Sequence, residues 1–337
     1  MRRLPKEPSV LDLTFATWDH DRVSALHDGR LSVPGVALES VVAPTSKLFP
    51  LAVTEAKYDI TEMSISSYIL QLSRGGSEYI ALPAFVSRAF RHAGYFARQG
   101  SGITTLADFA GRRIGVPEYQ MTAALWMRGI MQDEYGVSCD AIHWRTGALD
   151  EGVRVERLEL ALPKSMRVEP ITAGQTLEGL LLDGQIDGLL APKPPKAFLA
   201  GDPRLVRLFP DYEQAEEDYH KKTGFFPIMH VIGVRKSLCE KYPWLAKAVY
   251  EALVMSRDMA VARLRDIWLG NANRLTLPWL GASIERSIRV LGSDYWSYGY
   301  ERNLTELEAV CRYSMQQHLS ARQVAPSELF HPSVMEG

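Results

Sequence analysis

The sequence has few cysteines and no long hydrophobic run. Its three cysteines, Cys139, Cys239 and Cys311, lie far apart and form no CxxC pair. This spacing indicates neither a zinc site nor dithiol chemistry, so we expect three buried, reduced thiols. No stretch approaches the roughly 18 apolar residues that a membrane-spanning helix needs.

The chain also lacks an excess of either charge. Lysine and arginine number 38 against 40 acidic residues, a net charge of −2. Such a balance favours neither nucleic acid nor an anionic membrane as a partner, and a small-molecule ligand is expected. The start, MRRLPKEPSVLDL, has two arginines but then a proline, a lysine and a glutamate where a signal peptide has an apolar region. We therefore expect a cytoplasmic protein.

What the sequence does contain is core-forming material in an alternating α/β pattern. Hydrophobic residues make up 46% of the 337 positions, enough for two lobes. Strands are expected over 10–17, 36–42, 58–63, 80–85, 113–116, 167–170, 186–190 and 229–235. Helices are expected over 21–28, 45–56, 66–72, 106–109, 122–135, 176–183, 243–269, 282–291 and 304–318. The pattern predicts two α/β lobes with mostly parallel sheets and a helical C-terminal tail.

The order of the elements also predicts where the chain crosses between the lobes. Lobe 1 is expected to contain residues 1–92 and 231–337, and lobe 2 residues 93–230, with hinges near 88–95 and 225–231. Each hinge carries a histidine, His92 or His230. We expect both imidazoles at the floor of one ligand cleft, where either can transfer a proton.

The segment SRAFRH places two arginines beside an aromatic ring. Guanidinium groups bind carboxylates with paired donors and a phenyl ring stacks on aromatic ligands, so Arg88, Phe90 and Arg91 suit an aromatic acid. The alternative is that both arginines are solvated and Phe90 belongs to the core.

A second candidate segment runs from a strand into a helix at VPEYQMTA. The free amides of Tyr119 and Gln120 and the hydroxyl of Thr122 predict an anion site. Glu118 either accepts hydrogen bonds from ligand hydroxyls, as a catalytic group, or caps the helix.

The remaining candidates follow other strands. Ser64, Ser66 and Ser67 either donate to a ligand or cap a helix, and Glu62 can pair with an arginine. No GxSxG elbow marks a nucleophilic serine. Further ligand contacts are expected from residues after the first strand and from a proline-rich turn, with helix capping or a solvated surface as the alternative: Trp18, Asp19, Arg22 and Lys193.

The eight histidines show no HExxH or HxH spacing, so no metal is expected. A site built from the two hinge histidines and an acid such as Glu62 is the alternative.

Six long motifs carry a resemblance to a known family. They are YDITEMSISSYIL, FVSRAFRHAGYF, RRIGVPEYQMTAALWMRGIMQDEYGV, ITAGQTLEGLLLDGQIDGLLAP, TGFFPIMHVIGVRK and LGSDYWSYGYERN. In these segments the chain resembles the 4,5-dihydroxyphthalate decarboxylases, which have the type II periplasmic-binding-protein fold. It departs from the family at Lys193, where an arginine is expected, and in FATWDHDR.

The resemblance implies decarboxylation of 4,5-dihydroxyphthalate to protocatechuate without a cofactor. A hydroxyl para to each carboxylate lets the ring be protonated and then lose carbon dioxide. His92 or His230 would donate the proton, Arg88 and Arg91 would hold the remaining carboxylate, and Glu118 or Glu62 would accept from the hydroxyls. Lobe closure would exclude water around Phe90 or Met229. The main alternative is a non-catalytic solute-binding protein of an ABC transporter for a small aromatic or heteroaromatic ligand. A homo-oligomer is compatible with both functions.

Overall fold

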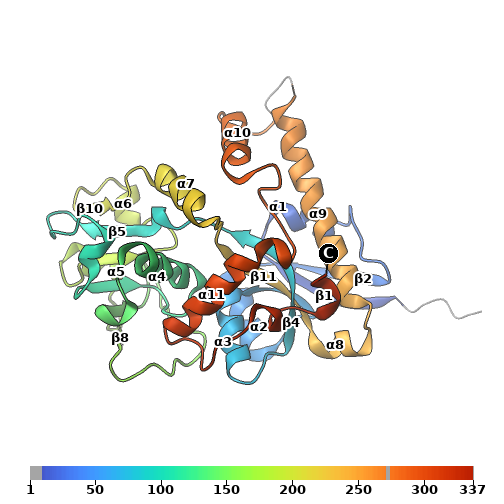
Figure 1. Cartoon of the computed structure of the whole chain (residues 1–337), viewed down its shortest axis with the longest axis horizontal. Helices are drawn as coiled ribbons and strands as arrows, with labels where there is room; N and C mark the ends of the chain where they lie inside the picture. The colour runs from blue at the N-terminus through green and yellow to red at the C-terminus, as the bar shows by residue number, and fades with distance from the viewer. Residues whose placement is uncertain (1–9, 271–273, 337) are drawn as a thin grey trace, which may run out of the picture.

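Two mixed sheets form the framework of the protein (Figure 1). The structure is a computed structural model that describes residues 10–270 and 274–336. The charged start of the chain, on which the expected absence of a signal peptide rests, lies largely outside the described residues. The N-terminal sheet and the C-terminal helices lie on one side of the molecule, and the second sheet on the other (Figure 1).

The first sheet has the strand order β2-β1-β3-β11-β4. Its strands are β1 (Leu11–Thr17), β2 (Val36–Val42), β3 (Ile60–Ser64), β4 (Tyr79–Arg88) and β11 (Ile228–Arg235). β1 is parallel to β2 and β3, whereas β11 is antiparallel to both β3 and β4. β11, a strand from late in the sequence, therefore lies inside the sheet between β3 and β4. It places His230 opposite Ser64.

The second sheet has the order β10-β5-β9-β6-β7-β8. Its strands are β5 (Tyr95–Arg98), β6 (Arg113–Val116), β7 (His143–Thr146), β8 (Arg167–Pro170), β9 (Gly188–Leu190) and β10 (Leu205–Arg207). The strands from β9 to β8 run parallel, which places the carboxyl ends of β6 and β7 at one edge. Ligands of such sheets bind beyond that edge.

Helices cover both sheets. They are α1 (Asp21–His27), α2 (Thr45–Glu55), α3 (Ile65–Ser73), α4 (Thr122–Tyr135), α5 (Leu177–Leu182), α6 (Lys196–Leu199), α7 (Tyr212–Thr223), α8 (Lys236–Lys241), α9 (Leu245–Trp268), α10 (Leu280–Leu291) and α11 (Leu304–Gln316). Ten residues of α4 are buried, because α3, α11 and the strand β11 of the first sheet pack on it.

The C-terminal helices contact both lobes. α9 packs on α1 and β4, as expected of a tail that returns to lobe 1, but α11 packs on α4 as well as on α3 (Figure 1). Gly129 in α4 lies directly against the ring of Tyr313 in α11, where a Cβ would overlap the ring. α11 therefore joins the two lobes, and the lobe boundaries expected from the sequence stay a prediction.

The three cysteines are buried and unpaired, as expected. Within the described part of the chain, no helix is both long enough and apolar enough to cross a bilayer.

Candidate active site

A cavity of about 780 Å³ lies between the lobes, within the size range of small-molecule sites. Its lining includes seven of the residues expected at the site: Trp18, Ser64, Arg91, Glu118, Thr122, Lys193 and His230. β3, β11, the turn before α4 and the segment from 153 to 157 all contribute side chains. The fold therefore brings fewer than half of the candidates named from the sequence to this cavity.

His230 is the histidine that faces this cavity. Its Nδ1 lies 2.6 Å from Oε1 of Glu62, a buried carboxylate on the adjacent strand β3. A carboxylate only accepts hydrogen bonds, so Nδ1 carries the proton and the lone pair of a neutral ring is on Nε2. The ring of Phe49 packs edge-on at 4.8 Å between centroids. Position and tautomer of the imidazole are thus fixed.

Glu62 is held by three donors. Oε1 also accepts from Nε2 of His20 at 3.0 Å, and Oε2 accepts the backbone N–H of Trp18 at 2.7 Å. Burial opposes ionisation of this carboxyl, but the hydrogen bonds from His20 and His230 outweigh it and lower the pKa of Glu62. Burial also lowers the pKa of His230, an effect that the hydrogen bond and charge of Glu62 oppose. The resting pair is a carboxylate and a neutral imidazole.

Arg91 supplies a cation without a partner. Among the described residues no hydrogen bond to its guanidinium is formed, and its buried Nε has no acceptor. Burial lowers the pKa of Arg91 to about 10, opposed by the charge of Glu216. An arginine remains charged at such a pKa near neutrality. A free guanidinium that lines a cavity is suited to bind a carboxylate of a ligand.

Glu118 is engaged by two arginines of the segment that follows β7. Oε1 accepts from Arg154, and Oε2 accepts from Nε of Arg157 at 2.7 Å. Because both carboxylate oxygens are taken, Glu118 anchors this segment. A catalytic role for Glu118 stays a prediction that its ion pairs disfavour.

The expected anion site before α4 is already occupied by a side chain of the protein. The backbone N–H of Tyr119 and that of Gln120, the latter at 3.2 Å, donate to the carboxylate of Glu156. Burial raises the pKa of Glu156, and these hydrogen bonds oppose the shift. The amides thus bind a carboxylate, as the sequence predicted, but one from the same chain.

The serines form a buried hydroxyl network. Ser64 Oγ lies 2.8 Å from Thr122 Oγ1, which joins β3 to the start of α4. Ser66 donates to the carbonyl of Gln120, and Ser67 Oγ lies within 3.4 Å of Ser64 Oγ. Ser64 and Thr122 face the cavity, whereas Ser66 and Ser67 join the lobes behind it.

The expectation that both hinge histidines share the cleft is wrong for His92. Its side chain is buried against Phe209 and Tyr219, and Nδ1 has no hydrogen-bond partner. Burial lowers the pKa of His92 to about 4. The β4 strand runs on to Arg88, so the following turn points His92 into lobe 2.

Arg88 and Phe90 are also displaced from the predicted site. Arg88 is buried and donates to Glu306 Oε2 at 2.9 Å, to Asn303 and to the carbonyls of Phe226 and Ser297. It therefore fastens α11 to the hinge, and both of its terminal nitrogens are engaged within the protein. Phe90 stacks on Phe226 and lines a different hollow, beside α7 and α10.

Three other candidates have structural contacts, and a fourth is exposed. Arg22 donates to Val86 and lies on the ring of Trp296, 4.0 Å from its centroid. Tyr119 is buried and donates to the carbonyl of Gln317. Asp19 is exposed, and it does not line the cavity. Lys193 does line it but pairs with Asp150 at 3.1 Å.

Several cavity residues were missed by the sequence reading. Arg154 and Arg157 lie in a polar, charged stretch after β7, where their clustered charges are the available signal. Phe49 gave no signal, because an apolar residue on α2 looks like core. His20 lies in the segment FATWDHDR but is not among the predicted ligand contacts. Only the fold brings it to Glu62.

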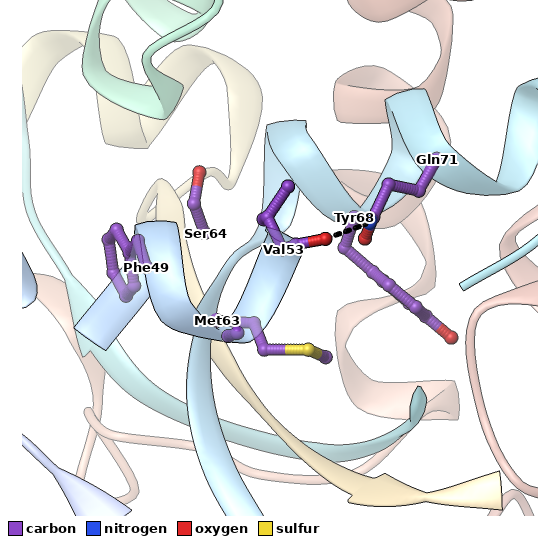
Figure 2. Close-up of a pocket in the computed structure, with 7 residues that line it drawn as sticks. Phe49, Val53, Met63, Ser64, Tyr68 and Gln71 are labelled. Carbon is purple, nitrogen blue, oxygen red and sulfur yellow. Dashed lines mark hydrogen bonds between the residues drawn. The ribbon is translucent and has the colours of Figure 1, made fainter. Parts of the chain in front are cut away.

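A second hollow lies behind Phe49, between α2 and α3, and is bordered by Met63 and Tyr68 (Figure 2). Gln71 closes it with a hydrogen bond of 3.4 Å to the carbonyl of Val53. Its room of about 10 Å³ suits at most one water molecule, so it is not a substrate site.

Two groups of side chains have the ligand types and spacing for a metal ion: His20, Glu62 and His230, and Cys139, Asp140 and His318. The first contains His20 where the alternative from the sequence had His92. However, Arg22 Nη2 lies 3.0 Å from His20 Nδ1. Arginine only donates, so the proton of His20 is on Nε2, the atom that a metal would need. The first group therefore fits a hydrogen-bonded network better than a metal.

Comparison with curated proteins decides the family. A 4,5-dihydroxyphthalate decarboxylase of Comamonas testosteroni is 38% identical over 328 residues, which cover 97% of this chain and 98% of that protein. One of Pseudomonas putida is 36% identical over 225 residues, covering 67% of this chain and 87% of that protein. The chain belongs to the 4,5-dihydroxyphthalate decarboxylase family. This membership confirms the resemblance and the expected enzyme class, a carboxy-lyase. No protein-family model matches the chain.

Solved structures confirm the expected fold of this decarboxylase family member. The periplasmic aliphatic sulphonate binding protein SsuA of Escherichia coli matches with a TM-score of 0.53 and 12% identity, covering 98% of this chain and 95% of that one. The alkanesulfonate-binding protein SsuA of Xanthomonas axonopodis pv. citri matches with a TM-score of 0.51 and 13% identity, covering 96% and 99%. At such identities the likeness concerns the fold alone.

Proposed function

We propose that this chain converts 4,5-dihydroxyphthalate to protocatechuate and carbon dioxide, with the chemistry supplied by substrate and side chains and no cofactor required. The observation that carries the proposal is the cavity shared by a free guanidinium, Arg91, and an imidazole, His230, that is fixed by Glu62. The first suits a carboxylate, and the second suits proton transfer.

The substrate itself provides the electron push. Each carboxylate of 4,5-dihydroxyphthalate is para to a hydroxyl, which makes the carbon bearing the carboxylate basic. Protonation of that carbon gives a tetrahedral centre, and cleavage of its bond to the carboxylate releases carbon dioxide while the bonding pair restores aromaticity. One proton enters the ring for each carbon dioxide that leaves.

His230 is the proposed donor of that proton. Its resting ring is neutral, and a dianionic substrate in the cavity favours uptake of a proton at Nε2 because opposite charge stabilises the imidazolium. Glu62 stabilises the same imidazolium through Nδ1–H. The proton then passes from Nε2 to the ring carbon, which returns the imidazole to its resting form.

Arg91 is proposed to hold the carboxylate that stays, and the hydroxyls of Ser64 and Thr122 are available to the catechol end of the ligand. Phe49 and Met229 furnish apolar surface in the same cavity, which weakens solvation of the departing carboxylate.

The direct test is carbon dioxide release from 4,5-dihydroxyphthalate by purified, chelator-treated protein, with the aromatic product identified by chromatography. Stoichiometric protocatechuate is expected. His230→Asn should abolish release while calorimetry still detects substrate binding. Binding by the parent protein without any release, even after divalent metals are restored, would instead favour a solute-binding protein.

A further inference from the structure

The buried network behind His230 extends further than the donor needs. Four side chains are linked in series: His230 and His20 both contact Oε1 of Glu62, and Arg22 contacts Nδ1 of His20 at 3.0 Å. His20 is only 9% exposed and Glu62 is fully buried. Neither His20 nor Arg22 lines the cavity, so neither is placed to contact a ligand.

Arg22 is itself held in place. Its Nε donates to the carbonyl of Val86 at 2.6 Å, its Nη1 to Asp21 at 2.8 Å, and its guanidinium lies over Trp296. These contacts leave Nη2 directed at His20. The guanidinium cannot accept a hydrogen bond, so His20 Nδ1 must accept.

The consequence for His20 follows from its two ring nitrogens. If Nδ1 accepts from Arg22, a neutral ring has its proton on Nε2, where it donates to Glu62 at 3.0 Å. A second proton on Nδ1 would face an N–H of Arg22. The neutral His20 ring is therefore held in the tautomer that donates from Nε2, and Oε1 of Glu62 also accepts the Nδ1–H of His230.

We infer that Arg22 and His20 are positioning residues of this decarboxylase: Arg22 fixes the tautomer of His20, and His20 fixes Glu62 so that His230 always presents Nε2 to the substrate. The effect of Arg22 and His20 on turnover rests on the proposed function of His230. The tautomer of His20 is a property of the resting protein.

The inference predicts opposite pH effects for two variants. The charged or titratable groups that act on His230 are Glu62, His20 and Arg91, and Arg157 lies beyond Phe49. In His20→Leu, Oε1 of Glu62 accepts a hydrogen bond from His230 alone, which favours the imidazolium of His230. The alkaline limb of the pH profile of kcat/KM should therefore move up by about half a pH unit. Arg22→Met lets His20 become an imidazolium, whose charge should move the limb down. Both variants should lose about tenfold in kcat.

His20→Gln is the conservative control. Its amide can donate to Glu62 and accept from Arg22 but cannot titrate, so it should recover most of the activity and keep the limb of the parent protein. A loss of activity in all three variants without any movement of the limb would reduce His20 and Arg22 to structural support and overturn the inference.

The experiment that separates this inference from the proposed reaction is ¹⁵N NMR of histidine-labelled protein, with the His20 signal assigned by its absence in His20→Gln. We expect the proton of the neutral His20 ring on Nε2 in the parent protein, and loss of this tautomer preference in Arg22→Met. These signals need no turnover, so they remain informative if 4,5-dihydroxyphthalate is not a substrate. A proton on Nδ1 of the neutral ring, or stoichiometric Zn²⁺ binding to His20 and His230, would overturn the inference.

Discussion

The two hinge histidines lie in opposite environments, although the sequence presents them alike. His230 has a carboxylate on one nitrogen and the cavity on the other, whereas His92 is enclosed by Phe209 and Tyr219 with no partner for Nδ1. Only the first arrangement can hold and release a proton. His92 should instead affect the stability of the fold.

His92 makes the fold sensitive to acid. Burial lowers its pKa from 6.5 to about 4, so between these values the unfolded chain binds a proton that the folded chain does not. Its contribution to stability is complete above pH 6.5 and falls as the pH drops toward 4, by about 2 kcal/mol at pH 5. The free energy of unfolding can be measured with urea at pH 5 and pH 7.5. Between these two pH values it should change by about 2 kcal/mol less in His92→Leu than in the parent protein.

The same variant distinguishes the two proton-donor candidates. At pH 7.5 His92→Leu should retain kcat, while His230→Asn should not. Loss of turnover in a folded His92→Leu protein would restore His92 as a candidate.

Arg91 is expected to bind substrate more than to accelerate its reaction. Because its guanidinium has no hydrogen-bond partner among the described residues, Arg91→Gln removes a charge-assisted contact to the substrate worth about 1.5–3 kcal/mol. KM for 4,5-dihydroxyphthalate should rise roughly 10- to 100-fold, by steady-state kinetics. Arg204→Gln, in an exposed turn beside Asp202, is the matched charge control and should leave KM unchanged.

Among the elements, the sequence predicted those with a clear apolar pattern, together with the short strands β6 and β8, and missed several that lack such a pattern. The helix over 122–135 and the strand over 36–42 have the predicted bounds, because long apolar patterns are bounded by turns. The strand Leu205–Arg207 and the polar helix Tyr212–Thr223 were missed, since a strand of three residues has no period and a helix with one buried residue has no apolar face.

The candidate site divides in the same way. Residues that follow directly from strand ends, such as Ser64 and His230, reach the cavity as predicted. Arg88 does not, because α11 returns with Glu306 and Asn303 and neutralises it. A partner more than 200 positions away leaves no local trace in the sequence.

Glu118 is one of two carboxylates that hold the segment carrying Arg154 and Arg157 over the cavity, the other being Glu156 of the segment itself. Glu118→Gln removes both ion pairs, so the segment should open more often. Limited trypsin digestion followed by mass spectrometry should show faster cleavage after Arg154 and Arg157. Glu151→Gln, whose exposed partner is Lys196, should leave that rate unchanged. Equal rates in all three proteins would mean that Glu118 does not anchor the segment.

The contact between α4 and α11 depends on the absence of a side chain at Gly129. Alanine there would overlap the ring of Tyr313, and overpacking of this kind costs about 1–3 kcal/mol. Urea unfolding should therefore give a lower free energy of unfolding for Gly129→Ala. Gly281→Ala in α10, where a Cβ meets only Trp268 at an ordinary 3.4 Å, should be neutral or slightly stabilising.

For the whole molecule, the fold draws the lining of one cleft from both lobes. His230 and Ser64 come from the first sheet, whereas Glu118 and Thr122 follow the second. Proteins of this architecture close around their ligands by hinge motion. Here α11 packs on helices of both lobes, which limits how far they can separate.

Closure can be measured on a complex that does not turn over. His230→Asn is expected to bind 4,5-dihydroxyphthalate without releasing carbon dioxide, so small-angle scattering can compare its free and saturated forms. A compact chain of this length has a radius of gyration of about 20 Å. We expect this radius to decrease on saturation, because Arg91 and the hydroxyls beside Thr122 draw both walls toward one ligand. In His230→Asn that also carries Arg91→Gln the decrease should need a higher ligand concentration. An unchanged radius at saturation would mean that the cleft binds its ligand already closed, with α11 holding the lobes together.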